Sequence, residues 1–222
     1  MSVRDPEARW LPSPNFRPGR TEPVDCVVVH GTFSVTEARS LNYLLRSKPP
    51  NRVSSHYLIC YSGEVLQLVD EGDTAWHAGR SAWGDRGALN GCSIGIEISN
   101  RGPEEPYADI QLDALEGLLG RILRRWQVPP RRVLGHSDVA TARKADPGEH
   151  FPWSRLERAG LAAPWVPVGA GAEPLAALRA WGWRGTDADV VRAFQRRYLR
   201  DHLGAGCCPE TTRFIQSGPG RW

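Results

Sequence analysis

The segment VLGHSDVATARKADPGEHFPW, residues 133–153, contains a histidine, a lysine and an aspartate after a short apolar run. They are His136, Lys144 and Asp146, and a second histidine, His30, ends the earlier apolar run CVVVH. A catalytic zinc ion takes about three protein ligands from histidine and carboxylate side chains and keeps one position for water. We therefore expect His30, His136 and Asp146 to converge on one zinc ion, if the strands before the two histidines are neighbours in a sheet.

Spacing alone does not establish this zinc site. A histidine at the end of a strand more often makes structural hydrogen bonds, and that interpretation stays open for both histidines. The run SIGIEIS, residues 93–99, adds a carboxylate, because its alternation places three isoleucines on one face of a strand and Glu97 on the other. Glu97 is then either an ordinary solvent-facing carboxylate or a catalytic group above the sheet.

A sheet and helices are needed to position these side chains. Apolar or alternating runs predict strands at residues 25–30, 53–61, 64–69, 93–99 and 132–135. The Ser62-Gly63 dipeptide suits a tight hairpin turn between the second and third of them. Helical spacing of apolar residues predicts helices at residues 36–47 and 109–127.

Two segments lack a regular period. Residues 1–23 carry five prolines and are expected to form an extended arm over the domain. Residues 70–92 are expected to form a long functional loop around Trp76, His77 and Trp83. Each of these three side chains is either a contact for the substrate or an ordinary structural residue.

The composition changes after Leu161 to AAPWVPVGAGAEP, which is typical of a linker. This change divides the chain into a first domain of residues 1–163, a linker of residues 164–173 and a small helical domain of residues 174–222. The predicted fold class is α/β, a central mixed β-sheet flanked by helices, followed by a small all-α domain. A helical core of this size is marginal on its own.

Five blocks follow one another in the order VVVHGT, SSHYLI, AWHAG, SIGIEIS and LGHSDVATARKADPGEHFPW. In this order they resemble the zinc-dependent N-acetylmuramoyl-L-alanine amidases related to bacteriophage amidase-lysozymes and animal peptidoglycan-recognition proteins. The resemblance covers about residues 8–158, and the last block is highly specific. The helical tail, with AFQRRY and PETT, resembles the small peptidoglycan-binding domain that some of these amidases carry.

The resemblance implies a role for each candidate residue. It makes His30, His136 and Asp146 the zinc ligands, Glu97 the catalytic carboxylate and Lys144 the group that stabilises the oxyanion. The implied reaction is hydrolysis of the amide bond between N-acetylmuramic acid and L-alanine in peptidoglycan or muropeptides, with zinc activating the water. Without the resemblance, a surface ammonium is an equally ordinary interpretation of Lys144.

One position departs from the pattern of many relatives. The residue after His30 is Gly31, where they carry an aromatic or polar residue or another histidine. We expect this glycine to leave more room beside the metal. Among the other histidines, His56 is expected to be a core or ligand-supporting group, and His150 is expected to be exposed.

Composition and charge exclude several classes of protein. The net charge of +3 comes without a clear basic stripe, so no nucleic-acid partner is expected, and no apolar run is long enough for membrane insertion. The opening MSVRDPEARWLPSP lacks the features of a secretory signal, which predicts a cytoplasmic protein, or a periplasmic one if a signal was removed. The five cysteines show no C-x-x-C spacing, which argues against a disulfide framework or a cysteine-rich zinc site.

The expected partners are peptidoglycan fragments or cell-wall glycan peptide, and the expected state is a monomer. Two alternatives to the amidase stay open. One is a non-catalytic peptidoglycan-recognition module, although members that only bind generally lack a zinc ligand. The other is a zinc endopeptidase that cuts within the stem peptide.

Overall fold

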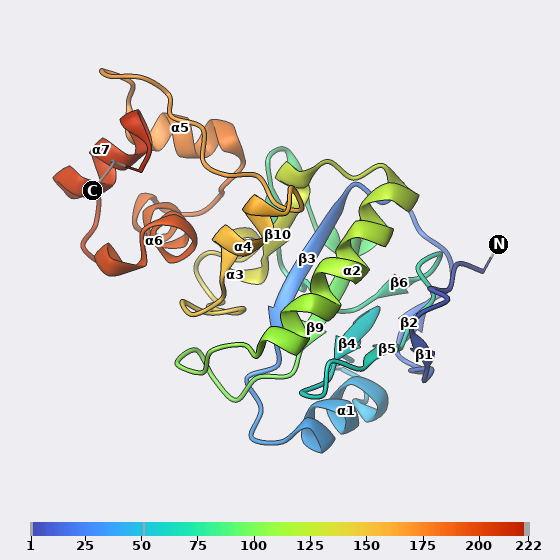
Figure 1. Cartoon of the computed structure of the whole chain (residues 1–222). Coiled ribbons are helices and arrows are strands. Elements are labelled where there is room, and N and C mark those ends of the chain that lie inside the picture. The colour runs from blue at the N-terminus through green and yellow to red at the C-terminus, as the bar shows by residue number, and fades with distance from the viewer. Residues whose placement is uncertain (1, 51, 220–222) are drawn as a thin grey trace.

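A computed structural model of the chain describes residues 2–50 and 52–219. At its centre is a six-stranded sheet in the order β1-β5-β4-β9-β3-β10 (Figure 1). These strands are β1 (Arg9–Trp10), β3 (Cys26–Gly31), β4 (Tyr57–Ile59), β5 (Val65–Gln67), β9 (Ser93–Ile98) and β10 (Val133–Gly135). Only β4 and β5 pair antiparallel within this sheet, and the other neighbouring pairs are parallel. The predicted mixed α/β fold is confirmed.

The hairpin of β4 and β5 is shorter than the two predicted runs. Its turn contains Gly63, which has a φ of +83° and donates its backbone N–H to the Cys60 carbonyl at 3.0 Å. The His56 carbonyl still accepts the Leu68 backbone N–H at 2.8 Å, whereas Ser54 donates its backbone N–H to the Trp76 carbonyl, outside the hairpin.

One face of the sheet is covered by α2 (Asp109–Trp126), which lies in front of the strands in Figure 1. Its buried leucines and Ile122 join a core cluster with the three isoleucines of β9, as the alternation of that strand predicts. On the opposite face of β9 lie Ser93, Gly95 and Glu97, so this face is free to carry polar groups.

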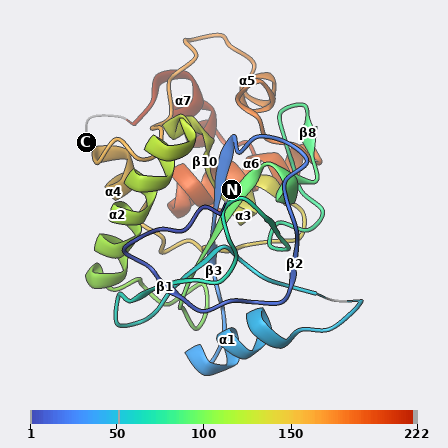
Figure 2. The same ribbon diagram turned by 90° about the vertical axis from the view of Figure 1, so that its right-hand side faces the viewer.

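The opposite face of the sheet has two separate apolar covers. The first is α1 (Glu37–Arg46), whose Leu44 packs on Leu58 and Leu66 from β4 and β5. The Thr36 hydroxyl caps this helix by accepting the Arg39 backbone N–H at 3.2 Å. In Figure 2, α2 lies on one side of β3, and the segment that contains β8 lies on the other.

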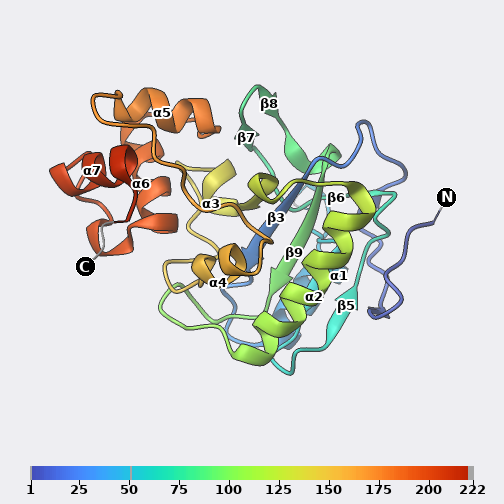
Figure 3. The same cartoon turned by 45° about the horizontal axis from the view of Figure 1, so that its top comes forward.

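The second cover is the helical unit, which we define as α5 (Pro174–Trp181), α6 (Asp187–Tyr198) and α7 (Pro209–Ser217) with their connections. One apolar cluster joins side chains from this unit to side chains of the sheet and its loops. It includes Trp183, Phe194 and Ile215 together with Val28 and Leu134. Figure 3 shows α3 (His136–Val139) between the helical unit and β3.

Two segments that were predicted to be irregular contain short regular elements. The arm pairs through β1, and β2 (Phe16–Arg17) pairs with β6 (Thr74–Ala75). The loop at 70–92 also contains the small pair β7 (Ala82–Trp83) and β8 (Arg86–Gly87). Beyond β10, the 133–153 stretch forms the single turn α3 and leads into α4 (Trp153–Arg158).

Among the residues that the structure describes, none of the helices combines the length and apolar composition needed to cross a bilayer. Cys26, Cys60 and Cys92 are buried free thiols, and Cys207 is exposed.

Candidate metal centre

The sheet topology brings the two histidines together. β3 and β10 are parallel neighbours, with Val29 opposite Gly135. The residue that follows each of them is a histidine, so His30 and His136 lie at the same edge of the sheet. His30 lies on β3, and His136 is the first residue of α3. Asp146 returns to this edge because the Ser137 backbone N–H donates to its carbonyl at 2.9 Å.

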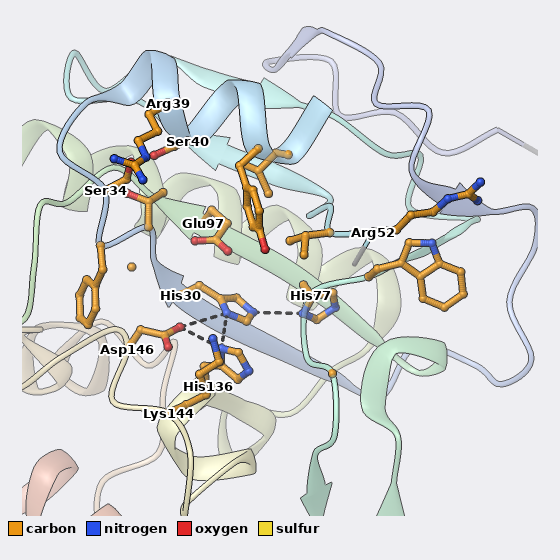
Figure 4. Close-up of a pocket in the computed structure, with 18 of the residues that line it drawn as sticks. His30, Ser34, Arg39, Ser40, Arg52, His77, Glu97, His136, Lys144 and Asp146 are labelled. Carbon is orange, nitrogen blue, oxygen red and sulfur yellow. Dashed lines mark hydrogen bonds and ion pairs between the residues drawn. The ribbon is translucent and has the colours of Figure 1, made fainter. Parts of the chain in front are cut away.

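The three side chains meet in one buried cluster (Figure 4). His30 Nδ1 lies 2.9 Å from His136 Nδ1, and Asp146 Oδ2 lies 3.2 Å from the first atom and 3.0 Å from the second. His30, His136 and Asp146 are 1%, 3% and 7% exposed, respectively. Two imidazole nitrogens and one carboxylate oxygen therefore face a common point, which is a possible metal site.

The other ring nitrogen of His136 shows which tautomer is present. His136 Nε2 lies 3.2 Å from the Ala78 carbonyl oxygen, which can only accept a hydrogen bond. The tautomer with its proton on Nε2 donates to this carbonyl, and Arg143 Nη2, itself a donor to the same carbonyl, lies 3.4 Å from Nε2. Since a neutral imidazole has one proton, Nδ1 presents a lone pair to the cluster.

A chain of hydrogen bonds assigns the same tautomer to His30. The Ser93 hydroxyl donates to the Leu89 carbonyl at 2.6 Å, so Ser93 Oγ accepts the proton of His77 Nε2 at 3.1 Å. His77 Nδ1 is then an acceptor, and His30 Nε2 donates to it at 3.1 Å. His30 Nδ1 thus also faces the cluster as a lone pair, fixed by a partner on its far side.

Three acceptors without a proton between them repel one another unless a cation lies among them. Burial, followed by the charge of His136, lowers the pKa of His30 to about 4, so its ring is neutral near pH 7. Two imidazole nitrogens and one carboxylate oxygen match the ligand set of a catalytic zinc ion.

Glu97 lies beside this cluster. It is paired in register with His30 on the neighbouring strand, and Figure 4 shows its carboxylate directed toward the space above the histidines. Its Oε2 is buried without a hydrogen-bond partner among the described residues. Burial, and then the charge of Asp146, raises the pKa of Glu97 to about 8, while Lys144 acts in the opposite direction. A carboxylate in this state can exchange protons near neutral pH.

The cluster lies in a cavity of about 960 Å³ that extends along α1. Lys144 lines the cavity beside His136, with no ion pair among the described residues. Arg39, Tyr43 and Trp76 line it farther from the cluster. The cavity therefore combines a metal-ligand set, a carboxylate with a free oxygen and several cationic groups.

Comparison with known proteins identifies the type of protein to which this site belongs. The sequence pattern of the N-acetylmuramoyl-L-alanine amidases matches residues 20–149, more than half of the chain. This chain belongs to the N-acetylmuramoyl-L-alanine amidase family. The matched region of this amidase family member contains all three candidate ligands, Glu97 and Lys144.

Individual members of this family are similar along much of the chain. N-acetylmuramoyl-L-alanine amidase AmiD from Escherichia coli is 37% identical over 155 residues, which cover 63% of this chain and 54% of AmiD. The match thus spans about half the length of that curated relative. A solved complex of AmiD with the substrate anhydro-N-acetylmuramic acid-L-Ala-D-gamma-Glu-L-Lys has a TM-score of 0.72 at 30% identity and covers 85% of this chain and 86% of that one.

A second solved structure matches the chain nearly end to end. AMPDH3 from Pseudomonas aeruginosa, in complex with anhydromuramic pentapeptide, has a TM-score of 0.76 at 30% identity. The match covers 96% of this chain and 95% of AMPDH3, so it includes the helical unit.

The structure brings some of the predicted contact residues to the cavity and excludes one. Trp76 lines the cavity and is half-buried. His77 also lines the cavity, and both of its ring nitrogens contact neighbours, His30 and Ser93. Trp83 is 4% exposed and packs edge-to-face on Trp183 of the helical unit, with the ring centroids 5.2 Å apart. The expectation of a substrate contact at Trp83 is therefore corrected, because the helical unit covers it.

The expectation for Gly31 is also wrong. A Cβ at this position would lie 2.3 Å from the Tyr107 hydroxyl. The room left by the missing side chain is therefore filled by Tyr107 and does not enlarge the space beside the metal. The Tyr107 hydroxyl donates to the Pro147 carbonyl at 2.7 Å, next to Asp146. Gly31 thus allows a contact that holds the segment of the aspartate ligand.

Several supporting residues were missed in the sequence. Ser93 and Gly95 lie on the same strand face as Glu97, and this alternation was the signal that could have found them. A Cβ on Gly95 would lie 2.5 Å from the His77 ring, so the glycine gives His77 its position against β9. Arg143 donates to the Ala78 carbonyl at 2.6 Å and so holds the acceptor of His136, which no local pattern indicates.

His56 and His150 lie where the sequence predicts. His56 is fully buried, and its Nδ1 accepts the Gly95 backbone N–H at 3.0 Å. The side chain of His150 is 43% exposed.

Proposed function

We propose that this protein is a zinc-dependent amidase that hydrolyses the bond between N-acetylmuramic acid and L-alanine in muropeptides or peptidoglycan. The observation that carries the proposal is the convergence of His30 Nδ1, His136 Nδ1 and Asp146 Oδ2, which lie within 3.2 Å of one another in a buried cluster. Membership of the amidase family supplies the reaction class.

In this proposal His30, His136 and Asp146 hold the zinc ion. When bound, zinc supplies Lewis acidity that makes water a stronger nucleophile near neutral pH and polarises a carbonyl group. Glu97 accepts the proton of the attacking water on its free oxygen and delivers it to the nitrogen of the departing L-alanine. The Lys144 ammonium lies beside the same space and stabilises negative charge on the carbonyl oxygen as the tetrahedral intermediate forms.

The cavity suits an anionic glycopeptide. Arg39 and Arg52 are exposed cations along its wall, and Trp76 offers a flat apolar surface for a sugar ring or a peptide. The solved relatives bind anhydromuramic acid peptides, whose free carboxylates are complementary to such cations. We propose anhydromuramyl peptides as substrates, with Trp76 as a contact and His77 as a support for His30.

The test is to incubate zinc-loaded protein with an anhydromuramyl tripeptide and identify the products by mass spectrometry. The expected products are anhydro-N-acetylmuramic acid and a tripeptide with a free L-alanine amino group. The Glu97→Gln variant should keep its zinc and lose activity by about 10²–10⁴-fold. Cleavage within the stem peptide would support the endopeptidase, and zinc-free binding without turnover would support a recognition module.

A second comparison addresses the physical form of the substrate. Turnover of soluble anhydromuramyl peptide should exceed turnover of insoluble sacculus, because the ligands in the two solved relatives are anhydromuramyl peptides. Faster release from sacculus would contradict this preference while leaving the proposed reaction intact.

A further inference from the structure

The turn that carries one candidate ligand and anchors another is too short to be stable alone. α3 is a four-residue helix, His136–Val139, and isolated helices of fewer than about 12 residues are marginal in water. His136 begins this turn, and the Ser137 backbone N–H donates to the Asp146 carbonyl. The position of α3 therefore determines where two of the three candidate ligands lie.

Asp138 is the residue by which α3 is held. Its Oδ2 accepts the backbone N–H of Gly135 at 2.8 Å, which closes the turn on itself. Its other contacts come from the helical unit: Trp183 Nε1 donates to Oδ1 at 3.1 Å, and Arg197 Nη1 donates to Oδ2 at 2.6 Å. The Asp138 and Arg197 side chains are 1% and 5% exposed, so water does not compete for these contacts.

Arg197 also contacts the elements on either side of α3. Its Nη2 donates to the Val133 carbonyl of β10 at 3.2 Å, and its guanidinium stacks at 3.9 Å from the centre of the Trp153 ring on α4. One side chain from α6 thus joins the strand before the turn, the turn itself and the helix after it. The Arg184 carbonyl adds a contact by accepting the Thr141 hydroxyl at 2.6 Å.

We propose that the helical unit is a fixed part of the metal centre, in which Arg197 and Trp183 are positioning residues that hold α3 for metal binding. The unit then serves to position His136 and Asp146 and does not move freely on its linker. The shared apolar cluster and the near end-to-end match with AMPDH3 agree with a fixed arrangement. This inference rests on the zinc site of the proposed function.

The test uses the full chain with Arg197→Met and Trp183→Phe, the second of which keeps an aromatic ring but removes the donor to Asp138 and part of the buried packing. Arg192→Met is the matched control, because Arg192 is an exposed arginine on the same helix. Leu178→Ala is a control for general destabilisation, since Leu178 is fully buried within the helical unit. Zinc dissociation constants are measured by chelator competition, and amide hydrogen exchange of residues 133–141 is measured without metal.

Arg197→Met should weaken zinc binding about tenfold, and Trp183→Phe by a smaller factor. Both should speed exchange over 133–141, whereas Arg192→Met should change neither quantity and Leu178→Ala should lower the melting temperature alone. Folded Arg197→Met protein with wild-type zinc affinity and wild-type exchange would overturn the proposal. If Arg197→Met does not fold, the same two measurements on Trp183→Phe decide whether the proposal holds. Wild-type protein that bound no zinc would refute the proposed function, while the metal-free exchange would still decide whether the helical unit holds α3.

Discussion

At the scale of single residues, hydrogen bonds on the far side of each imidazole determine which nitrogen is available to a metal. The Ala78 carbonyl fixes His136, and the sequence of contacts from Leu89 through Ser93 and His77 fixes His30. Without these partners each ring could present either nitrogen or rotate. The supporting residues are therefore expected to affect metal affinity although they do not touch the metal.

The first prediction concerns His77. His77→Ala removes the acceptor that orients His30, and we expect zinc affinity to fall roughly 10- to 100-fold, measured by chelator competition. His150→Ala, at a partly exposed histidine, serves as the control and should bind zinc as the wild type does. Unchanged affinity in His77→Ala would show that His30 needs no such partner.

The second prediction concerns Glu97 and pH in the metal-free protein. Its pKa is raised from an ordinary 4.5 to about 8, so the folded state keeps a proton that the unfolded state releases between these values. The unfolded state therefore gains stability relative to the folded state as pH rises through this range. Glu97→Gln should remove this fall in the free energy of unfolding. The variant should be more stable than the wild type by up to a few kcal/mol at pH 8, and by much less at pH 5.

Thermal denaturation in the presence of a chelator measures this difference at both pH values. Glu104→Gln is the matched control, because the Glu104 side chain is 91% exposed. A Glu97→Gln variant with the same pH dependence as the wild type would show that Glu97 is not held in its protonated form.

At the scale of elements, β9 contributes one face to the core and the other to the candidate site. The three isoleucines pack into the core with α2, and Ser93, Gly95 and Glu97 all face the candidate site. A glycine within a strand often marks a close approach of another group, and here that group is the His77 ring.

The third prediction tests that close approach. Gly95→Ala places a Cβ about 2.5 Å from the His77 ring, which forces the ring to move. We expect a loss of about 1–3 kcal/mol in the free energy of unfolding, measured with urea, together with weaker zinc binding. Gly87→Ala is the control on another strand, since its nearest neighbour would lie at 3.8 Å. Equal stability of the two variants would contradict the packing described for His77.

Local sequence patterns were sufficient to predict most helices and strands. They were not sufficient to predict which residues, distant in the sequence, pack against them. The alternation of β9 and the strand before His30 were visible in the sequence, because both depend on a period of two. Gly31 and Trp83 were misjudged because the residues that fill the adjacent space, Tyr107 and Trp183, are far away in the sequence. The turn α3 was missed because a single turn depends on tertiary contacts more than on its own sequence.

At the scale of the whole molecule, the linker does not separate two independent cores. A single apolar cluster contains Val28 and Leu134 from the sheet and Phe194 from the helical unit. The buried pair of Arg197 and Asp138 crosses the same boundary. The composition of the linker indicated a boundary in the chain, but it carried no information about contacts across that boundary.

The fourth prediction follows from this shared core. Scanning calorimetry of the full chain should show one cooperative transition, with equal calorimetric and van't Hoff enthalpies. The reason is that unfolding of the helical unit exposes the apolar side chains of the sheet that it covers. Two resolved transitions would show that the parts fold independently and would contradict this account.

The measurement that tests the central claim most directly is the zinc content of purified protein after dialysis. The account predicts one zinc ion per chain in the wild type and nearly none in His30→Ala, His136→Ala or Asp146→Ala. The control His150→Ala changes a partly exposed histidine outside the cluster and should keep the full equivalent. A full equivalent of zinc in any of the three ligand variants would contradict the assignment of His30, His136 and Asp146 as the metal site.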